Sequence, residues 1–312
     1  GLYWLCETIR IEETRVNIYE QPDMNEDMAT IGSWIMEIDN YEEEETFTIN
    51  TASPRHHVVY FTPKAPEIMS VMQKEWVKSE MEAIDKAINN PDPYSTEWMQ
   101  YVDLESAASY IAAQEIVGNN DGFMGSTYLW RDLDTKWHFG PLWDIEWNFQ
   151  AEDGRGWLWE QRFASDGGRT RWLPEWMHSR HLQMALERQF ALAASRLDEV
   201  IDFAEKFQAM TKAAQAVNAL IWPQYADIDF DRHWSAYIRP RLEKRMEWLQ
   251  SPDLFDSLNS GIEDVVDDAS RVVNSDYFTP AGQGVAAPAD KGLYIRRDVM
   301  HDGSVSYTKI AR

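Results

Sequence analysis

Two aspartates, Asp121 and Asp144, have the spacing and surroundings of carboxylates that act together in chemistry. They stand 23 positions apart and flank a segment that is predicted to form a β-hairpin. A phosphoryl-transfer site presents its carboxylates in this way, one on the loop before a hairpin and one on the loop after it. Magnesium needs only one or two carboxylates beside phosphate oxygens and water. The pair therefore suggests a site for a magnesium-bound nucleotide.

Spacing alone leaves ordinary structural roles open for both residues. Asp121 would then cap a turn and Asp144 would end a strand, as aspartates commonly do. On the spacing the ordinary roles are favoured, and the neighbouring residues are compatible with the functional interpretation. Small polar residues surround Asp121, which would leave its carboxylate accessible, and Pro141 and Trp143 would fix the loop that carries Asp144.

The elements that must position the two aspartates are a helix and the hairpin itself. The helix is predicted to begin after an N-cap at Asp103 and to run to Val117, where Gly118 suits its C-terminus. The hairpin strands are predicted at 127–130 and 137–139. One aspartate would thus follow the helix and the other would follow the second strand.

Other segments complete an α+β pattern. Strands are predicted at 2–11, 33–39 and 46–49, and a long helical segment from Pro66 to Ile88. A second helical region runs from His181 to about Leu249, with one break at Trp222-Pro223. A further strand pair is predicted at 292–296 and 304–309.

We predict four parts along the chain from these patterns. They are a partial β-rich lobe at 1–65, a helical lobe with the hairpin at 66–255, an acidic linker at 256–275 and a small β tail at 276–312. The chain opens directly on an apolar run, so we expect that an upstream portion of the first lobe is missing.

Composition narrows the class of partner. The chain has 53 acidic and 29 basic residues, a formal net charge of -24. Nucleic-acid binding needs clustered Lys and Arg, so no nucleic-acid partner is expected, whereas a basic protein substrate would be attracted. Cys6 is the only cysteine, which excludes an internal disulfide. No run of 18 apolar residues occurs, so no membrane span is predicted.

Two other groups of residues have a functional and a structural interpretation. The six tryptophans at 143, 147, 157, 159, 172 and 176 would bind sugars if they were exposed, although a role in the core is favoured. His178 and His181 stand three positions apart and could share a metal ion, although an ordinary role at a helix start is favoured.

Six short motifs occur in the order and spacing of one known family. They are GLYWLCE at 1–7, WIMEID at 34–39, YVD at 101–103, Glu115 with Asn120-Asp121, Tyr128, and PLWD at 141–144. With these motifs the chain resembles the CotH family of spore-coat-type, secreted atypical kinases, which have a remote protein-kinase-like fold. The resemblance covers roughly residues 1–250 and includes RMEWL at 245–249.

The resemblance implies phosphorylation of Ser or Thr in a protein substrate with ATP and Mg²⁺. Asp121 would orient the acceptor hydroxyl and take its proton, and Asp144 would bind metal. The expected metal ligands are Asp144, Asp121 and Ser126, and the expected nucleotide contacts are Asn120, Ser126 and Glu146.

The sequence departs from the family pattern at two of these positions. Ser126 stands where the family usually carries an Asn metal ligand, and Glu146 replaces the second Asp of the Trp-Asp-x-Asp motif. The upstream segment that should supply basic phosphate contacts is expected to be missing. The alternative function is therefore a non-catalytic surface module that binds protein or glycan through the tryptophan-rich region.

The tail is similar to a C-terminal segment common on secreted and surface proteins of the Bacteroidetes. The matching residues are Tyr277-Phe278, Gly282, Pro288, Lys291 to Ile295, and Lys309-Ile310. In that group the segment is a small β-structure associated with export or surface attachment. The resemblance implies a secreted or cell-surface protein.

Overall fold

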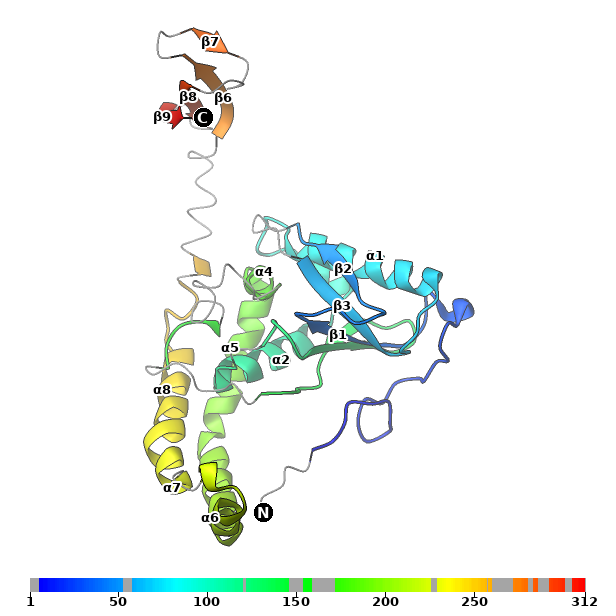
Figure 1. Ribbon diagram of the computed structural model, residues 1–312, viewed down its shortest axis with the longest axis vertical. Helices are drawn as coiled ribbons and strands as arrows, with labels where there is room; N and C mark the ends of the chain where they lie inside the picture. Colours follow the sequence, from blue (N-terminus) through cyan, green and yellow to red (C-terminus); the bar gives the residue numbers. More distant parts are fainter. Residues whose placement is uncertain are drawn as a thin grey trace. The chain divides into compact units, whose positions relative to one another are not determined.

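A computed structural model (Figure 1) places most of the chain in two compact units, Gly1–Leu254 and Phe255–Arg312. The structure describes residues 6–52, 58–119, 122–145, 154–158, 172–225, 229–256, 258–259, 272–279, 283–285, 292–300 and 305–311. The architecture is α+β, as expected, and fits a kinase-like fold. The division into lobes, linker and tail stays a prediction.

A five-stranded antiparallel sheet forms the centre of the first unit, in the order β2-β3-β1-β4-β5. The strands are β1 (Trp34–Asp39), β2 (Phe47–Asn50), β3 (Val58–Ala65), β4 (Thr127–Arg131) and β5 (Trp137–Phe139). All six residues of β1 are buried, as expected for a strand with neighbours on both edges and packing on both faces. The predictions at 33–39, 46–49, 127–130 and 137–139 are confirmed within a residue or two.

Helix α1 (Val71–Ile88) packs against this sheet. It begins later than predicted, because Ser70 and Gln73 form a capping box and the preceding residues continue β3 to Ala65. The Trp76 ring lies 6.0 Å from that of Trp34, and Arg131 of β4 is 4.8 Å above the Trp76 ring. These contacts fix α1 on β1 and β4.

Helix α2 (Leu104–Val117) begins and ends where the sequence predicts. The Asp103 carboxylate accepts a hydrogen bond from the Ser106 amide at 2.8 Å, and Gly118 adopts the left-handed conformation with φ of 60°. The Asp103 amide also donates to the Trp137 carbonyl at 2.9 Å. The start of α2 is thereby joined to β5, so the helix and the hairpin form one frame.

Helices make up the rest of the first unit. They are α4 (Leu173–Met177), α5 (Arg180–Ser195), α6 (Leu197–Ile221), α7 (Phe230–His233) and α8 (Arg239–Leu249), with short turns η1 (Glu26–Met28), η2 (Glu97–Gln100), η3 (Pro223–Tyr225) and η4 (Trp234–Ile238). The predicted break at Trp222-Pro223 is confirmed, since α6 ends at Ile221. Helices α2 and α5 pack side by side (Figure 1).

One predicted strand needs correction, and one strand of the central sheet was not predicted. Residues 2–5 of the strand predicted at 2–11 lie outside the described residues, and from Cys6 to Arg10 the chain is not a strand; Ile11 makes one isolated bridge, to Val16. A strand needs a continuous hydrogen-bonding neighbour, which this run lacks. Strand β3 was not predicted, although it pairs with both β1 and β2.

The second unit contains a four-stranded antiparallel sheet in the order β7-β6-β8-β9. The strands are β6 (Val272–Phe278), β7 (Gly284–Val285), β8 (Leu293–Met300) and β9 (Val305–Ala311). The predicted strand pair is confirmed as β8 and β9, and both strands are longer than predicted. Strand β6 begins at Val272, inside the stretch predicted to be a linker.

In the part of the chain that the structure describes, no helix has both the length and the apolar character required to cross a membrane.

Candidate functional site

The loop before the hairpin is held by a buried threonine. The Thr127 hydroxyl accepts a hydrogen bond from the Phe123 amide at 3.0 Å and donates to the Gly125 carbonyl at 3.2 Å. The Tyr110 hydroxyl of α2 lies 3.4 Å from the same oxygen. Burial raises the pKa of Tyr110, so this hydroxyl stays protonated and can donate. The loop is therefore tied to α2 through one hydroxyl group.

Further hydrogen-bonded side chains extend this network toward Asp121, the predicted catalytic residue. The Gln114 side-chain amide donates to the Tyr110 hydroxyl at 3.0 Å, and Asn119 donates to the Gln114 oxygen at 2.8 Å. The Gly122 amide donates to the Asn119 carbonyl at 3.1 Å. Asn120 and Asp121 lie between these two anchored residues but outside the described residues, so their roles stay predictions.

Two glycines in this loop have side chains of other elements close to their backbone. A Cβ on Gly125 would lie 2.9 Å from a carboxylate oxygen of Asp39, at the end of β1. A Cβ on Gly122 would lie 3.1 Å from the Gln114 side-chain oxygen. The loop is thus packed against both the sheet and α2.

Ser126 and Asp144 meet across the base of the hairpin. The Ser126 hydroxyl donates to an Asp144 carboxylate oxygen at 3.3 Å. Both residues have left-handed backbones, with φ of 51° and 58°. Left-handed conformations are costly for residues other than glycine, and they concentrate at functional sites. The Asp144 side chain is exposed and thus accessible to a ligand. Glu146 lies outside the described residues.

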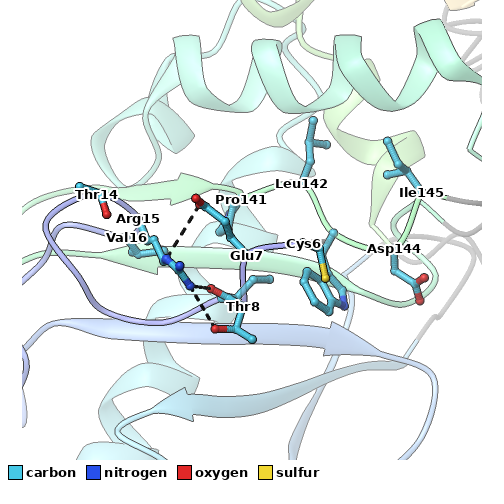
Figure 2. A pocket seen from close by; sticks show the side chains of 12 residues that line it. Cys6, Glu7, Thr8, Thr14, Arg15, Val16, Pro141, Leu142, Asp144 and Ile145 are labelled. Carbon is cyan, nitrogen blue, oxygen red and sulfur yellow. Dashed lines mark hydrogen bonds and ion pairs between the residues drawn. The ribbon is translucent and has the colours of Figure 1, made fainter. Parts of the chain in front are cut away.

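A pocket of about 1010 Å³ opens beside Asp144. Its lining comes from two distant segments, Cys6 to Ile9 with Thr14 to Val16 on one side and Pro141 to Ile145 on the other. Figure 2 draws Arg15 and Asp144 toward opposite ends of this lining, with Cys6 between them. The sequence predicted only the second of the two walls.

The first wall is organised around Arg15 (Figure 2). Its guanidinium donates to the Thr8 carbonyl at 3.3 Å and to the Thr8 hydroxyl at 3.2 Å, and it pairs with Glu12 at 3.1 Å and with Glu7 at 3.9 Å. Arg15 is the one Arg or Lys among the described residues that line the pocket. These contacts fold residues 7–15 into a defined wall although they form no strand.

The floor of the pocket is joined to the sheet. Trp143 packs against a buried cluster that contains Val16, Ile18, Ile35 of β1 and Tyr128 of β4. Burial, followed by a hydrogen bond to Glu37, raises the pKa of the Tyr128 hydroxyl. Trp143 therefore fixes the Asp144 loop against the core, as the sequence predicted.

The family model described as CotH kinase protein matches residues 1–239. The chain belongs to the CotH family. It is therefore a kinase-like protein. No curated protein and no solved structure matches the chain.

A buried ion pair in this CotH-family chain connects the predicted catalytic loop to the segment after the hairpin. Arg245 of α8 pairs with Glu115 of α2, and its Nε donates to the Glu115 carbonyl at 2.6 Å. The same guanidinium donates to the carbonyls of Gly154 and Gly156. The Glu115 carboxylate in turn accepts from the Leu158 amide at 3.3 Å.

We call Glu115, Arg245 and the segment 154–158 the clamp. Three parts of the CotH-family chain meet in it: the last turn of α2, α8 and the chain after Asp144. The sequence assigned no role to either charged residue, yet both stand within the motifs that carry the family resemblance. The available signal was that Glu115 and Arg245, which have opposite charges, both stand in motifs of the family resemblance although they are far apart in sequence.

The tryptophan-rich region lies mainly in the core. Trp157, Trp172 and Trp176 are fully buried, which confirms the core interpretation for these residues. Trp143 is partly buried, and the tryptophans at 147 and 159 lie outside the described residues. In the described part of the chain, this region therefore presents no exposed row of rings for a sugar.

The histidine pair has ordinary contacts. The His181 Nε2 lies 3.0 Å from the Tyr94 carbonyl oxygen, and its ring packs edge-on against the Tyr94 ring. Over the residues that the structure describes, no cluster of three or more His, Cys, Asp or Glu side chains could hold a metal ion. Any metal ion at Asp144 would thus need further oxygen ligands, from Ser126, the nucleotide, water or residues not described.

Proposed function

We propose that this CotH-family protein transfers the γ-phosphoryl group of ATP to a Ser or Thr hydroxyl of a protein substrate. The observation that carries the proposal is the exposed, left-handed Asp144 at the edge of a large pocket, hydrogen-bonded to Ser126 from the other side of the hairpin. A carboxylate and a hydroxyl oxygen are hard ligands that suit Mg²⁺. The alternative, a surface module that binds through exposed tryptophans, has less support because Trp157, Trp172 and Trp176 are buried and Trp143 is partly buried.

The nucleotide would enter the pocket between the two walls. Its volume, about 1010 Å³, is at the upper end of the range for ligand sites, and apolar side chains such as Ile9, Val16 and Leu142 contribute to its lining. Asp144 and Ser126 would hold Mg²⁺ with Asp121, and Asn120 and Glu146 would add contacts to the nucleotide. The bound metal ion would neutralise charge on the phosphates.

In the proposed reaction the acceptor hydroxyl forms a bond to the γ-phosphorus, and the bond from that phosphorus to the bridging oxygen breaks. ADP leaves with the bond electrons, and the Asp121 carboxylate accepts the hydroxyl proton. The network of Thr127, Tyr110 and Gln114 would keep the catalytic loop in place, so that little reorganisation is needed.

The single cysteine provides a direct test of nucleotide binding. Cys6 lines the pocket, is exposed and is the only thiol in the chain, so its rate of alkylation by a maleimide reports on occupancy of the pocket. We expect ATP with Mg²⁺ to slow the alkylation at least fivefold. Asp144→Asn should remove most of this protection, whereas Asp253→Asn, at an exposed position, should retain it. Equal rates with and without ATP would show that the pocket is not the nucleotide site.

Phosphoryl transfer is tested separately with radiolabelled ATP and a basic, Ser/Thr-rich protein as acceptor. Asp121→Asn should lose transfer by at least a hundredfold, because the proton acceptor is removed, and should keep part of the protection of Cys6, because Asp144 still binds the metal ion. Transfer at the wild-type rate in this variant would contradict the role of Asp121. Protection without transfer in the wild-type chain would indicate a nucleotide-binding protein without kinase activity.

The net charge of -24 supports a basic protein as the substrate. We also propose a secreted or cell-surface location, which rests on the resemblance of the tail to export-associated segments. A fusion of residues 255–312 to a reporter protein, expressed in a member of the Bacteroidetes, would test whether the tail directs surface attachment.

A further inference from the structure

Helix α6 carries an apolar stripe that faces solvent. Within this 25-residue helix only Ile201 is buried. The stripe consists of Val200, Phe203, Phe207, Met210, Val217, Leu220 and Ile221, which are all exposed. Phe203 is 70% exposed and Met210 is 73% exposed, values that are unusual for large apolar side chains on one helix face.

The spacing of the stripe is that of a coiled-coil seam. Positions 200, 203, 207, 210, 214, 217 and 221 alternate steps of three and four, and all of them are apolar. Such a repeat over three heptads places every side chain on one line along the helix and is typical of helices that pack against another helix. The Phe203 and Phe207 rings already stack on one another at 6.2 Å.

The side of α6 that contacts the rest of the unit mixes polar residues with Ile201 and small alanines. Lys212 pairs with Asp231 of α7 at 2.6 Å, and Glu205 pairs with Arg239 of α8 at 2.7 Å. The partly buried positions include Gln208, Thr211 and Gln215. An amphipathic helix normally buries its apolar face and exposes its polar face. In α6 the large apolar side chains of the stripe are exposed instead, so the stripe is available to a partner.

The size of the stripe matches a specific interface. Seven exposed large apolar side chains in one line over three heptads could supply a substantial part of the ~800 Å² per partner of a stable protein complex. The heptad spacing requires that the partner present a helix with the same seam.

The charges beside the stripe favour a second copy of this chain. The flanking positions are mostly uncharged: Ala204, Thr211 and Asn218 on one side, and Ala213 on the other. Glu199 and Lys206 are the exceptions, and they have opposite signs. Two copies could therefore pair through α6 without juxtaposing like charges, despite the net charge of -24 on each.

We propose that α6 is the interface of a homodimer in which the α6 helices of two copies pack against each other along this stripe. The interface is self-complementary, as a two-fold dimer requires. It lies in the first unit and is independent of the proposed phosphoryl transfer. The partner is a second copy of the chain rather than a lipid surface or a different protein.

The test is the mass of the chain in solution, measured by sedimentation velocity over a hundredfold range of concentration. The chain has a mass of 36.4 kDa, so a dimer has twice that value. We expect a dimer for the wild type and a monomer for Met210→Glu. The matched control is Ala209→Glu, which places the same charge one residue away at an exposed position off the seam and should stay dimeric.

A charge-pairing experiment establishes that the two α6 helices contact each other. Met210→Glu and Met210→Lys should each be monomeric, and an equimolar mixture should form dimers, because the introduced charges then attract. Circular dichroism should give helix content equal to the wild type for both variants. A wild type that is monomeric at all concentrations, or a dimer that Met210→Glu leaves intact, overturns the proposal. Binding to vesicles of anionic lipid by a monomeric wild type also overturns it and assigns the stripe to a membrane surface.

Discussion

The Asp144 carboxylate is positioned by a left-handed backbone and by one hydrogen bond to a residue distant in sequence. Its left-handed conformation would be costly in an unconstrained loop, and so would that of Ser126. The hydrogen bond between the two side chains joins the entrance and the exit of the hairpin. Ser126 was expected to replace an Asn as a metal ligand. In the structure the Ser126 hydroxyl has a further role, because its hydrogen bond orients the Asp144 carboxylate, which is proposed to bind metal.

Asp85 provides a residue-scale prediction about pH. Its carboxylate is buried and accepts hydrogen bonds from the Ala52 amide at 2.6 Å and from the Trp172 indole at 2.9 Å. Burial raises the pKa of Asp85 above its ordinary value. The folded state therefore keeps a proton at a pH where the unfolded state has lost it. The stability that this proton contributes is complete below the ordinary pKa and is lost as pH rises through the folded pKa.

We expect the Asp85→Asn variant to lack this dependence on pH. The free energy of unfolding of the wild type relative to Asp85→Asn should be highest near pH 4 and should fall toward pH 7, as measured by urea denaturation. Asp85→Ala should cost about 2–4 kcal/mol, since two buried donors lose their acceptor. Asp253→Asn, at an exposed position, serves as the control. A pH-independent difference between wild type and Asp85→Asn would contradict the assignment.

At the scale of elements, the clamp holds α2, α8 and the segment 154–158 together. Removing one member of a buried ion pair leaves the other charge without compensation, which costs ~3–5 kcal/mol. We therefore expect Arg245→Met to lower the free energy of unfolding by about that amount. Arg232→Met, on an exposed part of α7, should change it by less than ~0.5 kcal/mol.

A double-mutant cycle separates the ion pair from general packing. Glu115→Leu combined with Arg245→Met should cost less than the sum of the single changes, because both charges are then absent. Guanidinium denaturation of the four proteins provides the measurement. Additive costs would indicate that the backbone contacts of Arg245, and not its pairing with Glu115, account for the effect.

The elements that could be predicted from the sequence are those with local signals. Helix α2 was predicted from its caps at Asp103 and Gly118, and the hairpin from its turn. Strand β3 carries Pro63 and Lys64 in an otherwise suitable run, and it is a strand because β1 and β2 lie on either side of it. Such pairing is a tertiary property that a local pattern does not contain.

The candidate site shows the same limit. Asp144 could be selected from its motif, whereas the first wall of the pocket, around Arg15, could not be foreseen, because Arg15 and Pro141 are far apart in sequence. The clamp was missed for the same reason, since it joins positions 115 and 245. The exposed stripe of α6 has a local pattern, but a pattern cannot tell whether a neighbour covers it.

At the scale of the whole molecule, the division into two units leads to a prediction about truncation. The first unit has its own buried core, with fully buried tryptophans at 34, 98, 137, 157, 172 and 176. A chain that ends at Leu254 should therefore keep the thermal midpoint of the first unit within about 2 °C. Differential scanning calorimetry of both chains provides the measurement. A fall of more than about 10 °C would show that residues 255–312 support the first unit.

The order of strands in the central sheet has a consequence for biosynthesis. Strand β1 ends at Asp39, and its partner β4 begins at Thr127, so one edge of the central strand stays unpaired until about half of the first unit has been synthesised. An open, apolar strand edge is prone to pair with other chains. A nascent chain that stalls between β3 and β4 should therefore depend on chaperones, and synthesis at low temperature should increase the yield of folded protein.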